Sequence, residues 1–182
     1  MKKFIWIPIL FSAMLSGCQL APQGLDRGDN TLISYAQLAT ADFDCQCQQV
    51  RLGGKVIKAA VLKNNTTEVE ILSMTIDRFS AKPVLDSHSD GRFIAVLNGF
   101  VDPLSLDNQY ITVKGVLSGK LGGKIDQADY IYPLVKADNY RIWQQVVEYY
   151  YDEEAWFDYW DSQRHGYFFG GFPMWKPRAA LR

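Results

Sequence analysis

The chain has 182 residues, of which 48% are hydrophobic and 21% are charged, and its formal net charge is −1. This length suffices for one globular domain with a sizeable core, and the composition excludes a disordered chain and a polytopic membrane protein. Loss of Lys2 and Lys3 with a leader would leave the 20 acidic residues in excess by three. No nucleic-acid partner is therefore expected, because a phosphate backbone requires a basic face.

Residues 1–17 have the features of a secretory signal peptide. A positively charged start precedes an uncharged, mostly apolar run over residues 4–15, which is too short to span a bilayer as a helix of about 20 residues. Leu15-Ser16-Gly17-Cys18 then resembles the lipobox of bacterial lipoproteins, in which small residues precede an obligatory cysteine. Cys18 is thus the predicted lipidation site, carrying an S-diacylglycerol thioether and an N-acyl chain. The alternatives are an ordinary cysteine behind an ordinary leader, and a retained N-terminal anchor.

Lipid on Cys18 would hold the chain at a membrane without spanning it. Each buried methylene contributes about 0.8 kcal/mol, so two or three acyl chains make release negligible. Gln19 follows the cysteine, whereas an Asp at this position retains proteobacterial lipoproteins in the inner membrane. We therefore expect a lipid-anchored protein of the outer membrane that faces the periplasm.

Residues 18–29 are predicted to be the lipidated cysteine and a flexible tether, because prolines and glycines interrupt any apolar periodicity there. A β-barrel-like domain is expected over residues 30–148. It would begin with a short helix capped by Asn30 or Thr31. The expected inward residues of this helix are Leu32, Tyr35, Ala36 and Leu38.

Five strands are predicted between residues 50 and 143. The first contains the Gly53-Gly54 pair, which favours a bulge or a sharp bend, and an Asn64-Asn65 turn leads to the second. Asp102-Pro103 predicts a turn or a one-turn helix between the third and fourth. The expected strands are 50–62, 66–76, 92–100, 110–117 and 130–135, the last resuming over 140–143.

A bent first strand can serve both sides of a barrel. The predicted fold is therefore mainly β: a small five-stranded Greek-key barrel of the oligonucleotide/oligosaccharide-binding (OB) type. A short N-terminal helix and an aromatic-rich, partly helical C-terminal segment would accompany it. The alternative is a flat antiparallel sheet backed by the two terminal segments.

Six short motifs along the chain carry a family resemblance. They are Leu52-Gly53-Gly54-Lys55-Val56, Ala81-Lys82-Pro83, Gly91-Arg92-Phe93, Gly99-Phe100-Val101-Asp102-Pro103, Val113-Lys114-Gly115 and Ile142-Trp143. Together they resemble the Slp family of starvation-inducible outer-membrane lipoproteins, over nearly the whole mature chain to about residue 160. The resemblance implies a β-rich domain at the outer membrane and a link to nutrient limitation, and it carries no catalytic residue.

Cys45 and Cys47 lie outside that pattern. They would be oxidisable in the periplasm, and in an extended segment they share one face, near the upper limit of Cα separation for a disulfide. Three interpretations stay open: a strained disulfide or inert thiols, intermolecular or redox pairing, and binding of a soft metal such as Cu(I).

The sequence names no catalytic, cofactor or metal site. Asp86, His88 and Asp90 alternate in one loop, but the intervening serines indicate a solvated turn rather than a cation site. Two histidines are too few for a zinc hydrolase, and neither a Gly-x-Ser-x-Gly elbow nor a phosphate-binding glycine loop is present. We therefore expect a protein that is not an enzyme and has no cofactor.

The C-terminal extension, residues 149–182, mixes aromatic with acidic residues. Helical spacing before it predicts a helix that begins near Arg141 and packs on the barrel. The aromatic side chains either complete that packing or meet a partner, since rings with polar tips suit a membrane interface or a sugar. Because the acidic residues disfavour anionic lipid, an envelope protein or a glycan is the expected partner. The candidate contact residues are Trp156, Tyr159, Trp160, Phe168, Phe169 and Trp175.

These features predict a non-enzymatic binding or structural module of the envelope, linked to starvation or stress. Its membrane partner would be reached through the covalent lipid on Cys18. One alternative is an assembly factor for an envelope complex that uses the aromatic segment as its contact. The other is an enzyme acting on the cell wall or on lipid, for which the sequence supplies no residues.

Overall fold

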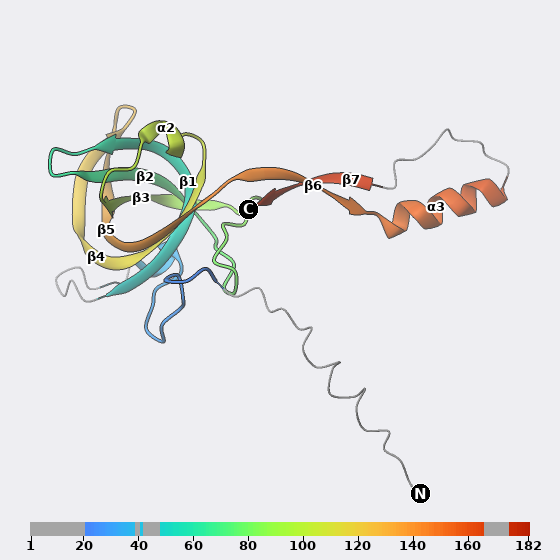
Figure 1. Cartoon of the computed structure of the whole chain (residues 1–182), viewed down its shortest axis with the longest axis horizontal. Coiled ribbons are helices and arrows are strands. Elements are labelled where there is room, and N and C mark those ends of the chain that lie inside the picture. The colour runs from blue at the N-terminus through green and yellow to red at the C-terminus, as the bar shows by residue number, and fades with distance from the viewer. Residues whose placement is uncertain (1–20, 39–40, 42–47, 166–174) are drawn as a thin grey trace, which may run out of the picture.

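The computed structural model describes residues 21–38, 41, 48–165 and 175–182, and it consists of a ring of strands and a projecting arm (Figure 1). The ring strands are β1 (Gln49–Val61), β2 (Thr66–Met74), β3 (Ser89–Asn98), β4 (Tyr110–Ile125) and β5 (Ala128–Trp143). The arm contains β6 (Gln145–Tyr151), α3 (Glu153–Arg164) and β7 (Trp175–Leu181). Two one-turn helices, α1 (Tyr35–Leu38) and α2 (Pro103–Leu106), pack on the ring.

The ring closes because β1 pairs along both of its edges. One edge pairs with β2 and the other with β4, where Gln49 lies opposite Val116 and Lys55 opposite Tyr110. The complete order is β1-β2-β3-β5-β4, in which β3 and β5 are parallel and the other neighbours antiparallel. The mainly β prediction is confirmed, and the flat-sheet alternative is wrong.

Gly54 allows β1 to pass close to β2. A Cβ atom at this position would lie 1.9 Å from the carbonyl oxygen of Leu72. Shortly afterwards the register between the two strands shifts between Val56 and Lys58, and such a bulge increases the local bend of a strand. One strand can therefore follow both sides of the ring.

The ring encloses one apolar core. Side chains from all five strands alternate into it, as the period of a strand requires, and each large aliphatic side chain contributes about 1.5–3 kcal/mol on burial. Leu106 of α2 covers part of this core, and Asp102 caps α2 by accepting a hydrogen bond from the Leu104 amide at 3.0 Å. The fully buried members include Val50, Val69, Ile71, Phe93, Leu97, Ile111, Val113, Leu117 and Val135.

A second buried cluster lies on the outer face of the ring. This outer cluster consists of Leu25, Ala81, Tyr110, Trp143 and Leu181. It gathers the N-terminal segment, the loop after β2, two ring strands and the end of β7. The elements that leave the ring at both ends of the chain are thus packed together at one place.

Arg51 fastens the N-terminal segment to that outer face. It lies between Val50 and Leu52, which face the core, so its side chain points to the opposite side of β1. The guanidinium is fully buried and donates hydrogen bonds of 3.0 Å to the carbonyl oxygens of Leu25 and Arg78. Burial lowers the pKa of Arg51 from its usual value.

The expected tether is wrong in the part that the structure describes. Leu25 is buried and Ala21 packs against the outer cluster, so the chain is held from its first described residue. The prolines and glycines of this segment form turns rather than a flexible linker, as the hydrogen bond from the Leu25 amide to the Pro22 carbonyl shows.

The N-terminal helix is shorter than expected and has a different cap. Ser34 precedes α1 and accepts a hydrogen bond from the Ala36 amide, while the Gln37 side chain accepts one from the Ser34 amide. These two bonds form a capping box. Leu32 is not helical, because it bridges to Val50 of β1.

The predicted helix near Arg141 is also wrong, because residues 141–143 belong to β5 and residues 145–151 to β6. The helix was predicted from the spacing of Ile142, Val146, Val147 and Tyr150. Three of these recur every four residues, and an even spacing also places side chains on one face of a strand, whereas Val147 lies on the other face of β6. β4 and β5 are longer than expected, since a turn at Asp126 joins them with a φ of 53°. Their outer ends are exposed and polar, which hid the pairing from the sequence pattern.

Candidate functional site

The arm begins and ends at the ring. β6 follows β5 after the single residue Gln144, and the amides of Gln144 and Arg182 each donate to the carbonyl of the other, at 2.9 and 3.0 Å. The C-terminus therefore lies at the base of the arm, beside the ring (Figure 1). β6 and β7 form a separate two-stranded sheet.

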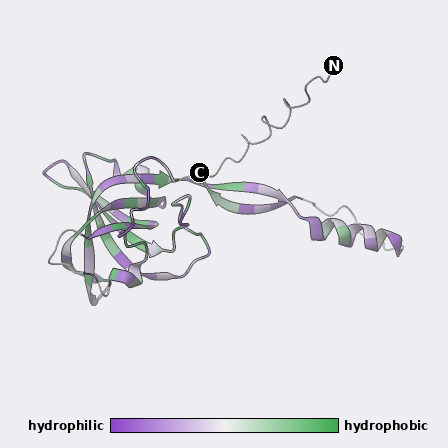
Figure 2. Cartoon of the chain, turned by 90° about the horizontal axis from the view of Figure 1, so that it is seen from below, coloured by the Kyte–Doolittle hydropathy of each residue, from purple (hydrophilic) through white to green (hydrophobic). Residues whose placement is uncertain are grey.

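The β6–β7 hairpin has one apolar and one polar face. On the first, Tyr149 lies opposite Pro177 and Tyr151 opposite Trp175; on the second, Glu148 lies opposite Arg178. We call the first the apolar face of the arm; the end of the hairpin next to the ring is coloured hydrophobic in Figure 2. Its members are Val147, Tyr149, Tyr151, Trp175, Pro177 and Ala179.

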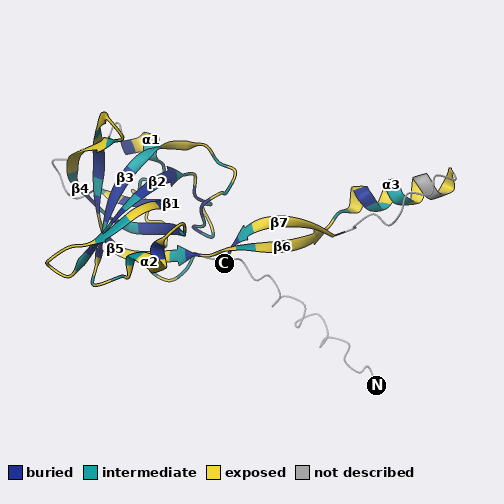
Figure 3. Ribbon diagram, turned by 90° about the horizontal axis from the view of Figure 1, so that it is seen from above, coloured by how far each residue is buried: buried dark blue, intermediate teal, exposed yellow. Residues whose placement is uncertain are grey.

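The apolar face of the arm is uncovered. The exposed fractions are 63% for Val147, 66% for Tyr149 and 57% for Trp175, and the hairpin is coloured as exposed along most of its length in Figure 3. An isolated two-stranded hairpin is at best marginally stable in water. A partner that covers this face would therefore also stabilise the arm.

Asp152 joins α3 to the hairpin. Its Oδ1 atom accepts a hydrogen bond from the Ala155 amide at 3.2 Å, which caps the helix, and its Oδ2 atom forms an ion pair with Lys176 of β7. The hydrogen-bonded ammonium lowers the pKa of Asp152, and the same contact raises the pKa of Lys176. The helix is thus fixed to both strands at the end of the hairpin.

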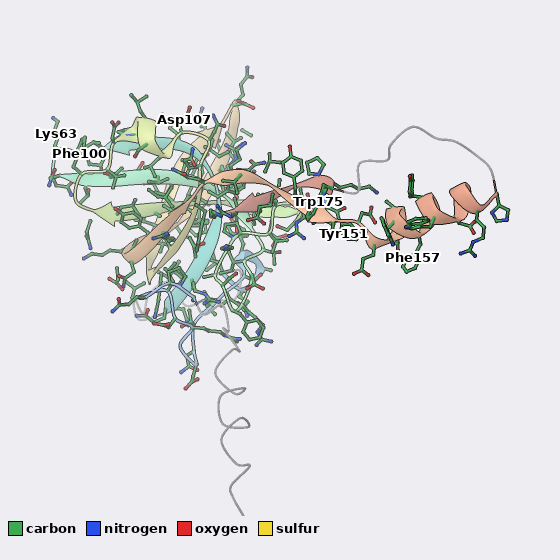
Figure 4. All side chains as sticks on the ribbon, turned by 45° about the vertical axis from the view of Figure 1, so that its right-hand side comes forward. Lys63, Phe100, Asp107, Tyr151, Phe157 and Trp175 are labelled. Atoms are coloured by element: carbon green, nitrogen blue, oxygen red, sulfur yellow. The ribbon has the colours of Figure 1, made fainter. Side chains whose placement is uncertain are left out.

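Ring contacts continue the apolar face from the hairpin onto α3. Ring centroids are 5.7 Å apart for Trp175 and Tyr151, 6.3 Å for Tyr151 and Trp156, and 5.4 Å for Trp156 and Trp160. Tyr159 then contacts Trp160 at 5.9 Å. Tyr151 and Trp175 lie next to each other where the hairpin meets the helix (Figure 4).

Three of the four acidic residues of α3 lie away from these rings, whereas Glu153 and Arg164, at the two ends of the helix, fall on the aromatic half. At 100° per residue, the aromatic positions 156, 157, 159 and 160 occupy roughly one half of the helix circumference. Glu154, Asp158 and Asp161 occupy the other half. Phe157 and Trp160 are 70% and 50% exposed, so the outer part of the arm presents an aromatic surface with an acidic back.

Four of the predicted contact residues, Trp156, Tyr159, Trp160 and Trp175, meet in this aromatic series. The candidate contacts Phe168 and Phe169, the lipidation site Cys18 and the pair Cys45 and Cys47 lie outside the described residues. Sequence reasoning left Val147, Pro177 and Ala179 out of the candidate contacts. All three residues lie next to charged residues in the sequence. This alternation shows that they share one face only once the pairing of β6 with β7 is known.

The ring itself carries a polar hollow of ≈ 250 Å³ between β2 and the outer part of the β4–β5 hairpin. Within it Glu70 accepts a hydrogen bond from Arg92 at 2.8 Å and one from the Tyr132 hydroxyl at 3.4 Å. Burial raises the pKa of Tyr132. The Glu70 carboxylate is therefore engaged in an ion pair with Arg92.

Two further observations concern the described part of the chain. Over residues 21–38, 41, 48–165 and 175–182, no three side chains of His, Cys, Asp or Glu gather so that they could hold a metal ion. Within the same ranges, none of the helices has both the length and the apolar character needed to cross a bilayer.

Comparison with known proteins gives the family. The outer membrane lipoprotein Slp family matches residues 15–175. An uncharacterized protein of Haemophilus influenzae is 45% identical over 153 residues, covering 82% of this chain and 83% of that protein. The uncharacterized lipoprotein YeaY of Escherichia coli is 33% identical over 147 residues, which cover 75% of this chain and 72% of YeaY. Outer membrane protein Slp of Escherichia coli is 29% identical over 134 residues, which cover 72% of this chain and 70% of Slp.

No solved structure matches the chain. The family match spans the segment before the ring from residue 15, the ring, and the arm up to the start of β7. It confirms the resemblance predicted from the six motifs, and the outer membrane is the location named for the family. The chain belongs to the Slp family of outer-membrane lipoproteins.

Proposed function

We propose that the protein is a non-enzymatic binding module of the outer membrane and that the arm is its binding surface. The observation that carries this proposal is the uncovered apolar face from Val147 to Trp175, continued by the rings of α3. Contiguous exposed apolar surface on a folded protein marks an interaction site. The arm also projects away from the ring, so a partner can reach it without disturbing the core (Figure 1).

The proposed anchor is lipid on Cys18, on the periplasmic face of the outer membrane. Support comes from the lipobox and from the family. Cys18 precedes Ala21 by three residues, and Ala21 packs against the outer cluster. Three extended residues span at most about 11 Å, so such an anchor would hold the ring close to the bilayer surface.

The ring has features that support the OB-like Greek-key assignment. β1 pairs with both β2 and β4, β3 runs parallel to β5, and α2 connects β3 with β4. Folds of this type serve mainly as binding scaffolds. We regard the ring as the rigid base that positions the arm, and its use under nutrient limitation as the physiological setting that the family resemblance implies.

An assembly factor for an envelope complex is the alternative, and it would use the same surface of the arm. A cell-wall enzyme has less support, because the carboxylate in the polar hollow, Glu70, is engaged by Arg92 and Tyr132. The ligand classes expected for a binding module here are an envelope protein, a glycan or the bilayer itself.

Photo-crosslinking in intact cells tests whether the arm is the binding surface. A photoreactive residue replaces Tyr149 in one strain and Lys63 in the other; Lys63 is exposed at the side of the ring remote from the arm (Figure 4). We expect covalent adducts from position 149 and few from position 63. Equal labelling at both positions, or none at 149, would contradict the proposal.

A further inference from the structure

The apolar face of the arm reaches the outer cluster at its base. Leu181 belongs to the same alternating series of β7 as Ala179, Pro177 and Trp175, and it is buried in the cluster with Leu25. Ala21 packs against that cluster as well. A lipid on Cys18 would therefore be attached within about 11 Å of Ala21, and so near the cluster that also contains the end of the arm.

The hairpin part of this face carries no charged residue. On the polar face of the hairpin, Glu148 pairs with Arg182 at 3.7 Å, and Lys176 pairs with Asp152. On α3, Glu154, Asp158 and Asp161 occupy the half of the helix opposite its rings, and Glu153 and Arg164 at the helix ends lie on the aromatic half. Most of the acidic charge that disfavours anionic lipid is thus directed away from the aromatic surface.

The dimensions and chemistry of the face suit a lipid surface. A seven-residue strand extends for about 24 Å and a twelve-residue helix for about 18 Å. Along this length, tyrosine and tryptophan combine an apolar ring with a polar tip, which is the character of side chains at the membrane interface. An anchor at the base keeps the bilayer at high effective concentration, so even a weak contact is populated.

We propose that the apolar face of the arm lies on the lipid surface into which the acyl chains of Cys18 insert. This inference rests on the proposed lipidation of Cys18. Anchor and arm then contact the bilayer at two places, and together they fix the orientation of the ring. A second copy of the chain or an envelope protein on the same face would be a different outcome of the test.

Tryptophan fluorescence on vesicles tests this contact. The mature lipidated protein is reconstituted into vesicles of phosphatidylethanolamine with a minority of phosphatidylglycerol, whose acyl chains are brominated to quench nearby tryptophans. Trp156, Trp160 and Trp175 report on the arm, whereas Trp143 is 3% exposed in the outer cluster and gives a constant background. We expect strong quenching of the arm tryptophans.

Tyr149→Glu and Tyr150→Glu form a matched pair, because these adjacent tyrosines lie on opposite faces of β6. Tyr149→Glu places a charge on the apolar face and should lower the ratio of lipid-bound to free arm by about tenfold or more, which corresponds to about 1.4 kcal/mol. Tyr150→Glu should leave the quenching nearly unchanged. Both variants must retain the unfolding transition of the parent protein.

Sedimentation with the vesicles separates the two proposals. Protein that sediments and is quenched, with the quenching lost in Tyr149→Glu alone, supports the inference. Protein that sediments without quenching, or that crosslinks from position 149 to a second copy, overturns the inference and leaves the anchor intact. If the protein does not sediment with the vesicles, both the proposed lipid anchor and this inference are wrong.

Discussion

Leu25 and Leu181 pack in the same buried cluster, with 1% and 5% of their surfaces exposed. The first belongs to the segment that follows the proposed lipid anchor, and the second is the last residue of the arm's hairpin. Their packing makes the N-terminal segment, the outer face of the ring and the base of the arm one unit.

Leu25→Ala should lower the free energy of unfolding by about 2–4 kcal/mol, because it leaves a cavity in the outer cluster. Leu104→Ala is the matched control, since Leu104 is 84% exposed, and it should change stability by less than about 0.5 kcal/mol. Urea unfolding measures both. A tolerated Leu25→Ala would contradict the packing of the N-terminal segment.

Arg51→Met should destabilise the fold by about 2–5 kcal/mol. The substitution retains much of the side-chain length but removes the donors to the carbonyls of Leu25, which is buried, and of Arg78, and an unsatisfied buried group costs about 1–3 kcal/mol. Lys63→Met, on an exposed turn, should be nearly neutral. Hydrogen exchange should show the loss of protection in residues 22–32; unchanged protection there would argue against the role of Arg51.

Gly54→Ala should prevent or severely weaken folding, because its Cβ would lie 1.9 Å from the carbonyl oxygen of Leu72. Backbone atoms cannot move aside as a flexible side chain can. Gly122→Ala offers the comparison, since a Cβ there meets nothing within 4 Å, and it should fold normally. Thermal unfolding followed by circular dichroism distinguishes the two. Equal stability would show that β1 does not approach β2 as described.

The Asp152–Lys176 pair should make the arm sensitive to acid. The pKa of Asp152 is lowered from 3.8, so the contribution of the carboxylate is complete above that pH and is lost as the pH falls through the lower folded-state value. The pKa of Lys176 is raised from 10.5, so its contribution is complete below that pH and is lost as the pH rises through the higher value.

Near-ultraviolet circular dichroism of the arm's aromatic series reports this titration. We expect a loss of signal below about pH 3.8 and a second loss above pH 10.5. Asp152→Asn keeps a helix cap but removes the charge, so it should abolish the acid transition. If the variant and the parent protein titrate identically in acid, the ion pair does not hold α3 to β7.

Most of the ring can be predicted from the sequence, because glycines and turn residues mark bends and turns through their own backbone preferences. The pair Gly53-Gly54 predicts a bulge or a bend in β1, and the register shift lies close by, between Val56 and Lys58; Asp102-Pro103 predicts a turn or a one-turn helix, which is α2. The N-terminal segment was misjudged because the partner of Leu25 is the buried Arg51, 26 residues further along the chain. A basic residue between two core positions, such as Arg51, is expected on the solvent-facing side of its strand. Nothing in the neighbouring sequence shows that another segment covers that side.

The arm was only half predicted. Its aromatic residues were recognised as a candidate surface, but the hairpin was not, because β6 and β7 are separated by α3 and by further residues of the chain. The spacing of Ile142, Val146, Val147 and Tyr150 favours a helix, although the four-residue steps among three of them also fit one face of a strand. Only the pairing of Tyr149 with Pro177 and of Tyr151 with Trp175 shows that the apolar residues share one face.

The central claim is that the chain is anchored by lipid at Cys18, immediately before a packed N-terminal segment. Intact-mass and peptide mass spectrometry of the protein purified from outer membranes tests it directly. The account predicts a mature chain that begins at Cys18 and carries the mass of a diacylglyceryl group and an amide-linked acyl chain. A mature chain that begins at another residue, or one that carries no acyl mass, would contradict it.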